Sequence, residues 1–86
     1  MKIQIDPHTL ERAEERGANE EEIKDVINTG VPIKGRYGRL GKAKVYNFKQ
    51  KRQNEYYEQK RIEVFYIKEE DAIITVTVYV FYGKWR

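Results

Sequence analysis

A histidine and two arginines recur at intervals of four residues near the start of the chain. His8, Arg12 and Arg16 therefore fall on one face of any helix that spans them, and this face has no apolar residue of its own. Like charges at this spacing destabilise a helix by about a few tenths of a kcal/mol, so the stripe suggests an anionic partner. The alternative is a solvated face that Glu15 partly neutralises.

These residue types fit the cleavage of RNA through its own 2′-hydroxyl, because the protein then supplies only a base, an acid and cations around the phosphate. His8 is the candidate base, since the helix start and the neighbouring Arg12 both favour a neutral ring. Arg12, with Arg16, would stabilise charge on the phosphorane oxygens. Tyr79, with Thr77 as a hydrogen-bonding neighbour, would protonate or orient the leaving oxygen. The alternative for His8 is a capping or surface residue.

A second concentration of cations lies in a glycine-rich segment, residues 34–42. Arg36, Tyr37, Arg39 and Lys42 are interspersed with glycines there, a pattern that suits phosphate contacts and stacking on bases. The segment is not a P-loop, because its glycine spacing differs and no Ser or Thr follows the Gly-Lys pair. The alternative is a flexible, charged turn between strands.

Two helices are predicted in the first third of the chain. Asp6 precedes a proline as the N-cap of the first, and Gly17 ends it. Asn19 and Glu22 form a capping box for the second, and Gly30 closes it before a proline. Apolar residues at helical spacing predict the buried face of the second helix: Ile23, Val26 and Ile27.

The remainder is rich in β-branched and aromatic residues. A short strand is possible around Ile3, and strands are predicted over residues 44–50, 61–68 and 73–82, the last two joined by a tight turn. The polar segment 51–59 is expected to be a long, mobile connection. We therefore predict one α+β domain over residues 1–86, with two N-terminal helices packed on one face of an antiparallel sheet of three to four strands.

The last predicted strand separates two kinds of side chain by alternation. An aliphatic face is expected to meet the helices: Ile74, Val76, Val78, Val80 and Tyr82. The opposite face carries hydroxyls and rings: Thr75, Thr77, Tyr79 and Phe81. This second face is either an ordinary solvent side or a reactive surface.

Composition narrows the classes of function. The 86 residues contain no cysteine and one histidine, which excludes disulfides, thiolate metal ligands and multi-histidine sites, and no cofactor or metal is expected. No signal peptide or membrane span is recognisable, so we expect a cytoplasmic protein. A net charge of +3, with 36% charged and 13% aromatic residues, fits a nucleic-acid partner, although thermophilic proteins also carry such charge.

Residues 8–23, HTLERAEERGANEEEI, together with the ending Thr77-Val78-Tyr79, resemble the domain-of-unknown-function 4258 family of small bacterial proteins. Members begin with a His-x-x-x-Arg helix, an Arg-Gly stop, a cap and an acidic second helix. The likeness covers the first thirty residues well and the last ten loosely, and the middle of the chain departs from it. That family in turn resembles the small ribonuclease toxins of RelE-like and barnase-like fold.

The resemblance implies metal-independent ribonuclease activity with His8 and Arg12 in the active site, Tyr79 as a further candidate, and an antitoxin as partner. Residues 82–86 offer an edge to such a partner. One alternative is a nucleic-acid-binding module without catalysis, which uses the basic segment 34–42. Another is a protein-interaction domain anchored by exposed aromatic residues: Tyr56, Tyr57, Phe81 and Trp85.

Overall fold

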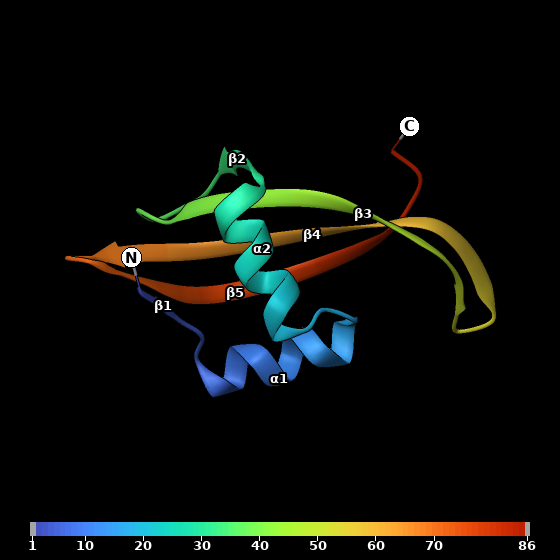
Figure 1. The fold of residues 1–86 in the computed structure, drawn as a ribbon, viewed down its shortest axis with the longest axis horizontal. Coiled ribbons are helices and arrows are strands. Elements are labelled where there is room, and N and C mark those ends of the chain that lie inside the picture. The colour runs from blue at the N-terminus through green and yellow to red at the C-terminus, as the bar shows by residue number, and fades with distance from the viewer. Residues whose placement is uncertain (1, 86) are drawn as a thin grey trace.

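The computed structural model describes residues 2–85, in which one helix crosses a face of a five-stranded sheet and the other lies along the edge of that sheet (Figure 1). The elements in chain order are β1 (Lys2–Gln4), α1 (Pro7–Arg16), α2 (Glu20–Thr29), β2 (Val31–Lys34), β3 (Leu40–Arg52), β4 (Glu55–Glu69) and β5 (Ala72–Gly83). Met1 and Arg86, the last residue of the predicted partner edge, lie outside the described residues. No helix within residues 2–85 is long and apolar enough to cross a membrane.

The sheet differs from the predicted one in strand number and direction. Its order is β1-β5-β4-β3-β2, with β1 parallel to β5 and every other pair antiparallel. The prediction of an antiparallel sheet of three to four strands was therefore wrong. The strand that the sequence pattern missed is β2, because Pro32 interrupts its apolar run; a proline is tolerated there since β2 is an edge strand.

Local signals set both helices as predicted. The Asp6 carboxylate accepts hydrogen bonds from the amides of His8 and Thr9 at 3.1 and 3.2 Å, and Gly17 ends α1 at a φ of 104°. The capping box of α2 is complete, with Asn19 and Glu22 bonding each other's backbone amides at 2.8 and 3.1 Å. Such caps contribute about 1 kcal/mol each.

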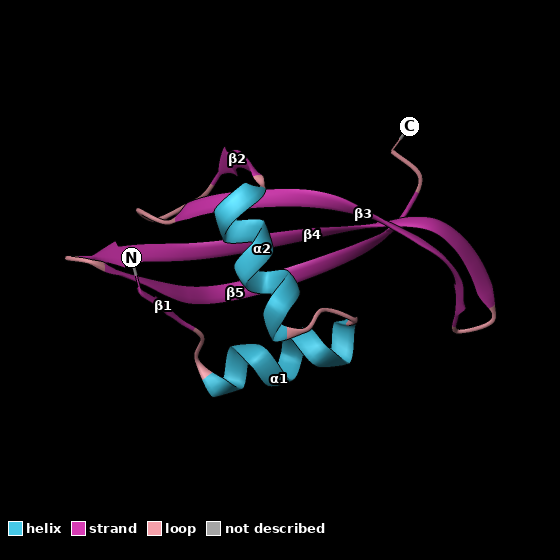
Figure 2. Cartoon of the chain, viewed as in Figure 1, coloured by secondary structure: helices cyan, strands magenta, loops and turns pink. Residues whose placement is uncertain are grey.

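The β3–β4 hairpin is longer than the sequence pattern indicated. Both strands continue through residues 51–59, and a two-residue turn at Gln53 and Asn54, with φ of 53° and 67°, joins them. Figure 2 shows this hairpin curling past the helices as continuous strand. The prediction of a long connection over residues 51–59 was wrong, because no side chain of this segment is buried and the alternating pattern of a strand is therefore missing.

The core lies between α2 and the central strands. Its largest fully buried side chains are Ile23, Val26, Ile62, Val64 and Val78. The helical period predicted the two α2 members of this set, and the alternation of the last strand predicted Val78 on the face toward the helices.

A β-bulge at Val76 changes which face of β5 each side chain occupies. Thr77 pairs with Phe65 and Thr75 pairs with Tyr66, so Val76 has no partner on β4. Thr75 is consequently buried at 3% exposure, whereas strict alternation placed it on the outer face. The predicted alternation holds from Thr77 onward, where the pairing with β4 is regular.

The junction of the two helices is held by side chains from the long strands. Tyr82 donates its hydroxyl to the carbonyl of Arg16 at 2.7 Å, and the Arg52 guanidinium lies 4.9 Å from the Tyr82 ring. Lys60 donates to the carbonyl of Gly17 at 2.8 Å. Burial raises the pKa of the Tyr82 phenol. These contacts fix the C-terminal end of α1 on the sheet.

Gly17→Ala should destabilise the protein more than Gly38→Ala. Both glycines have positive φ, so each alanine costs about 1 kcal/mol in backbone strain. A Cβ at Gly17 would also collide with the Tyr82 hydroxyl, whereas no atom of residues 2–85, its chain neighbours apart, lies within 4 Å of a Cβ at Gly38. Displacing the Tyr82 hydrogen bond costs about 1 kcal/mol further. Urea unfolding measures the difference, and equal losses for the two variants would contradict this contact.

Candidate active site

Helix α1 lies along the edge of β5 (Figure 1). β1 pairs with β5 only as far as Ile74, which leaves later carbonyls on that edge without a strand partner. The Thr9 hydroxyl donates to the Val76 carbonyl at 3.3 Å, and the Arg16 guanidinium donates to the Val78 carbonyl at 2.7 Å. Side chains of α1 therefore replace the strand partner that β1 supplies only as far as Ile74.

A small pocket lies between α1 and this edge, and we call it the edge pocket. Its volume is about 180 Å³, and its lining includes four predicted site residues: His8, Arg12, Arg16 and Thr77. The volume is below the roughly 300 Å³ at which pockets for larger ligands begin. The edge pocket therefore suits a small group such as a phosphate.

The charge in the edge pocket is positive. Arg12 and Arg16 contribute two cations, and Asp6 contributes one carboxylate that already accepts two amides of α1. Within residues 2–85 no acidic side chain, Glu15 included, forms an ion pair with either arginine. The stripe is thus an unneutralised cationic surface facing a pocket.

Arg16 is held in one orientation. Beside its bond to the Val78 carbonyl, its guanidinium carbon lies 5.5 Å from the centre of the Tyr79 ring. A guanidinium has five N–H donors, so donors remain for an oxyanion. Two fixed contacts make Arg16 a preorganised cation rather than a mobile surface chain.

A larger pocket lies on the sheet face opposite the helices, and we call it the face pocket. Its volume is about 360 Å³, with the loop cations on one side and the sheet residues Phe65, Thr77 and Tyr79 on the other. Phe65 and Thr77 pair directly across β4 and β5, next to the buried pair Val64 and Val78, so they point away from the core. Thr77 lines both pockets.

The loop beside the face pocket is a defined turn. Tyr37 and Gly38 have φ of 57° and 75°, as a two-residue hairpin turn requires, and the Arg39 amide donates to the Arg36 carbonyl at 3.1 Å. The Tyr37 side chain is 89% exposed. A bulky residue at positive φ is strained, and such strain concentrates at functional sites.

The predicted site residues therefore separate into groups. Arg36, Tyr37, Arg39 and Tyr79 line the face pocket, whereas Lys42 lines neither pocket. Lys42 pairs with buried Val64 and so points to the helix side of the sheet.

Sequence reasoning did not identify Phe65 as a site residue. The sequence does contain a signal for Phe65. It alternates with Arg61 and Glu63 on one side of its strand, where a large ring has no core to fill.

A polar cluster outside the pockets joins α2 to β3. Lys44 and Tyr46 donate to the Asp25 carboxylate at 2.7 and 2.6 Å. The Lys44 hydrogen bond, followed by that of Tyr46, lowers the pKa of Asp25, while burial and the Asp25 hydrogen bond raise the pKa of Tyr46. Every group in the cluster has a partner, so the cluster is structural. The structure has no group of three or more potential metal-ligating side chains within residues 2–85.

Comparisons with family models, with curated proteins and with solved structures found no match. The resemblance to the domain-of-unknown-function 4258 family and to RelE-like toxins thus stays a prediction.

Asp25→Asn should change how stability depends on pH. Because folding lowers the pKa of Asp25 from its ordinary 3.8, its contribution is present above that value and is lost as the pH falls through the folded-state pKa. The wild type should therefore lose more stability than the variant below about pH 4. Urea unfolding across the acidic range measures this, and parallel pH profiles would show that Asp25 contributes nothing.

Proposed function

We propose that the protein is a small, toxin-like, metal-independent ribonuclease that cleaves RNA through its 2′-hydroxyl. The main observation in support of the proposal is the edge pocket. Its lining includes His8, Arg12, Arg16 and Thr77, and its size suits a phosphate. A base, two cations and a hydroxyl are the groups that this reaction needs from a protein.

In the proposed reaction the scissile phosphate lies in the edge pocket. His8 takes the proton from the 2′-hydroxyl, whose oxygen attacks phosphorus and forms the 2′,3′-cyclic phosphate. Arg12 and Arg16 stabilise the negative charge on the phosphorane oxygens. The bond to the 5′ oxygen then breaks, and that oxygen takes a proton from solvent or from a hydroxyl of the edge pocket; Thr77 is the candidate, because the Thr9 hydroxyl already donates to the Val76 carbonyl.

The relationship to ribonuclease toxins, an antitoxin partner and a cytoplasmic location belong to this proposal. The order of elements supports the relationship, since helices precede an extended sheet in both. This is an analogy of fold, so the chemistry must be tested directly.

A second candidate is nucleic-acid binding without catalysis. It is favoured by Lys34, Arg36 and Arg39 and by the exposed Tyr37, all of which line the face pocket and do not depend on His8.

His8→Ala should reduce RNA cleavage by about 100-fold or more, the usual contribution of a general base. The assay incubates single-stranded RNA and matched DNA with each protein in excess chelator and detects 2′,3′-cyclic phosphate ends. DNA should stay intact because it lacks the nucleophile. Arg12→Gln should lose a similar factor.

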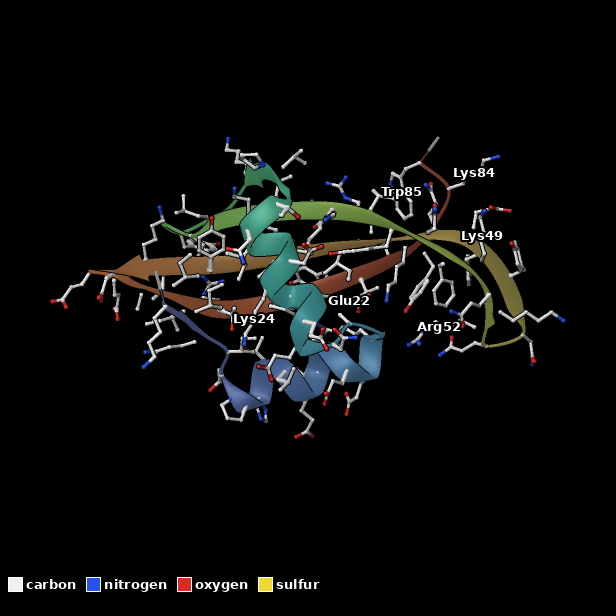
Figure 3. All side chains as sticks on the ribbon, in the orientation of Figure 1. Glu22, Lys24, Lys49, Arg52, Lys84 and Trp85 are labelled. Atoms are coloured by element: carbon white, nitrogen blue, oxygen red, sulfur yellow. The ribbon has the colours of Figure 1, made fainter. Side chains whose placement is uncertain are left out.

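Lys49→Gln is the matched control for a lost cation, since Figure 3 shows Lys49 on the curled hairpin, away from α1. It should cut RNA like the wild type. Salt-sensitive RNA binding without cleavage by the wild type would instead establish the binding module.

A further inference from the structure

On the basis of the proposed function, we propose that the face pocket binds the nucleobase of the nucleotide whose phosphate lies in the edge pocket. The two pockets meet at Thr77, on the outer face of β5 beside its edge. A ligand that fills both must carry a small anionic group next to a larger group. A nucleotide has this form.

The size of the face pocket fits the larger group. Its volume of about 360 Å³ is twice the roughly 180 Å³ of the edge pocket. It falls within the range of about 300–1,000 Å³ that is usual for small-molecule sites.

Aromatic walls indicate that the larger group is planar. Phe65 and Tyr79 meet edge to face with ring centres 6.0 Å apart, and Tyr79 is 43% exposed. Gly41 lies opposite Phe65, where a Cβ would be 2.9 Å from the Phe65 ring, so the missing side chain leaves room for the ring over β3. Covering Gly41 is also a structural role of the Phe65 ring, since an aromatic side chain beside a strand glycine stabilises a sheet. The exposed Tyr79 ring, with the half-buried Phe65 ring beside it, offers the aromatic surface that base stacking requires.

The positive charge around the face pocket favours a polyanion over a neutral ring compound. Lys34, Arg36 and Arg39 line the face pocket, and within residues 2–85 none of them forms an ion pair with an acidic side chain. They are placed to contact the phosphates on either side of the bound nucleotide. Because a stacked base must leave its own helix, the substrate class is single-stranded RNA.

The test compares adenosine 5′-monophosphate with ribose 5-phosphate, which has the phosphate and sugar but no base. Calorimetric titration should show that the nucleotide binds about tenfold tighter or more, as expected for one stacked base. Phe65→Leu still covers Gly41 but removes the ring, so most of this preference should disappear. Tyr56→Leu removes an exposed ring from the hairpin and should keep the preference.

Tyr37→Asn provides a second variant in case Phe65→Leu does not fold. Asparagine tolerates positive φ, and the 89% exposed Tyr37 ring makes no core contact, so the variant should fold and show a weaker preference for the nucleotide. Equal binding of the two probes to the wild type would overturn the base pocket. Cleavage of RNA by the same protein would show that the proposed function survives that result, since the binding assay involves no cleavage.

Discussion

The carbonyl groups of Val76 and Val78 lie on the edge of β5 beyond the end of β1, and α1 supplies their hydrogen-bond donors. Backbone groups at a covered edge need such partners, so the position of α1 on the sheet is set by Thr9 and Arg16. The same docking turns the cationic stripe toward Thr77 and creates the edge pocket. Arg16 thus links stability to the proposed chemistry, because one guanidinium bonds the edge and lines the pocket.

The bulge at Val76 connects the two pockets. It allows Thr75 to enter the core while Thr77, two positions later, points to the outer face. Bulges are frequent next to active sites, where they redirect a side chain. Here the redirected hydroxyl lies between a small cationic pocket and a larger aromatic one, so the outer face of β5 continues the proposed site that begins at α1.

Local chemistry made both helices predictable. Caps, stops and the apolar period of α2 depend on residues a few positions apart, and the His8, Arg12 and Arg16 stripe follows from the same period. The sheet was less predictable, because pairing depends on distant residues. β2 was obscured by its proline, the hairpin extension has no buried face, and the bulge shifts the alternation without a local signal. Several residues that line the two pockets were named from the sequence, but their division between two pockets was not, since the faces of Phe65 and Lys42 depend on strand register.

The most direct test asks whether α1 and the outer face of β5 form one RNA site. It follows the backbone amide chemical shifts of the protein by NMR as a single-stranded RNA with 2′-O-methyl groups is added. The methyl groups remove the nucleophile, so binding is observed without cleavage. We predict shifts in the first turn of α1, in residues 34–39 and in residues 76–79, with no change in the hairpin around residues 49–56. Shifts confined to that hairpin, or none at saturating RNA, would contradict it.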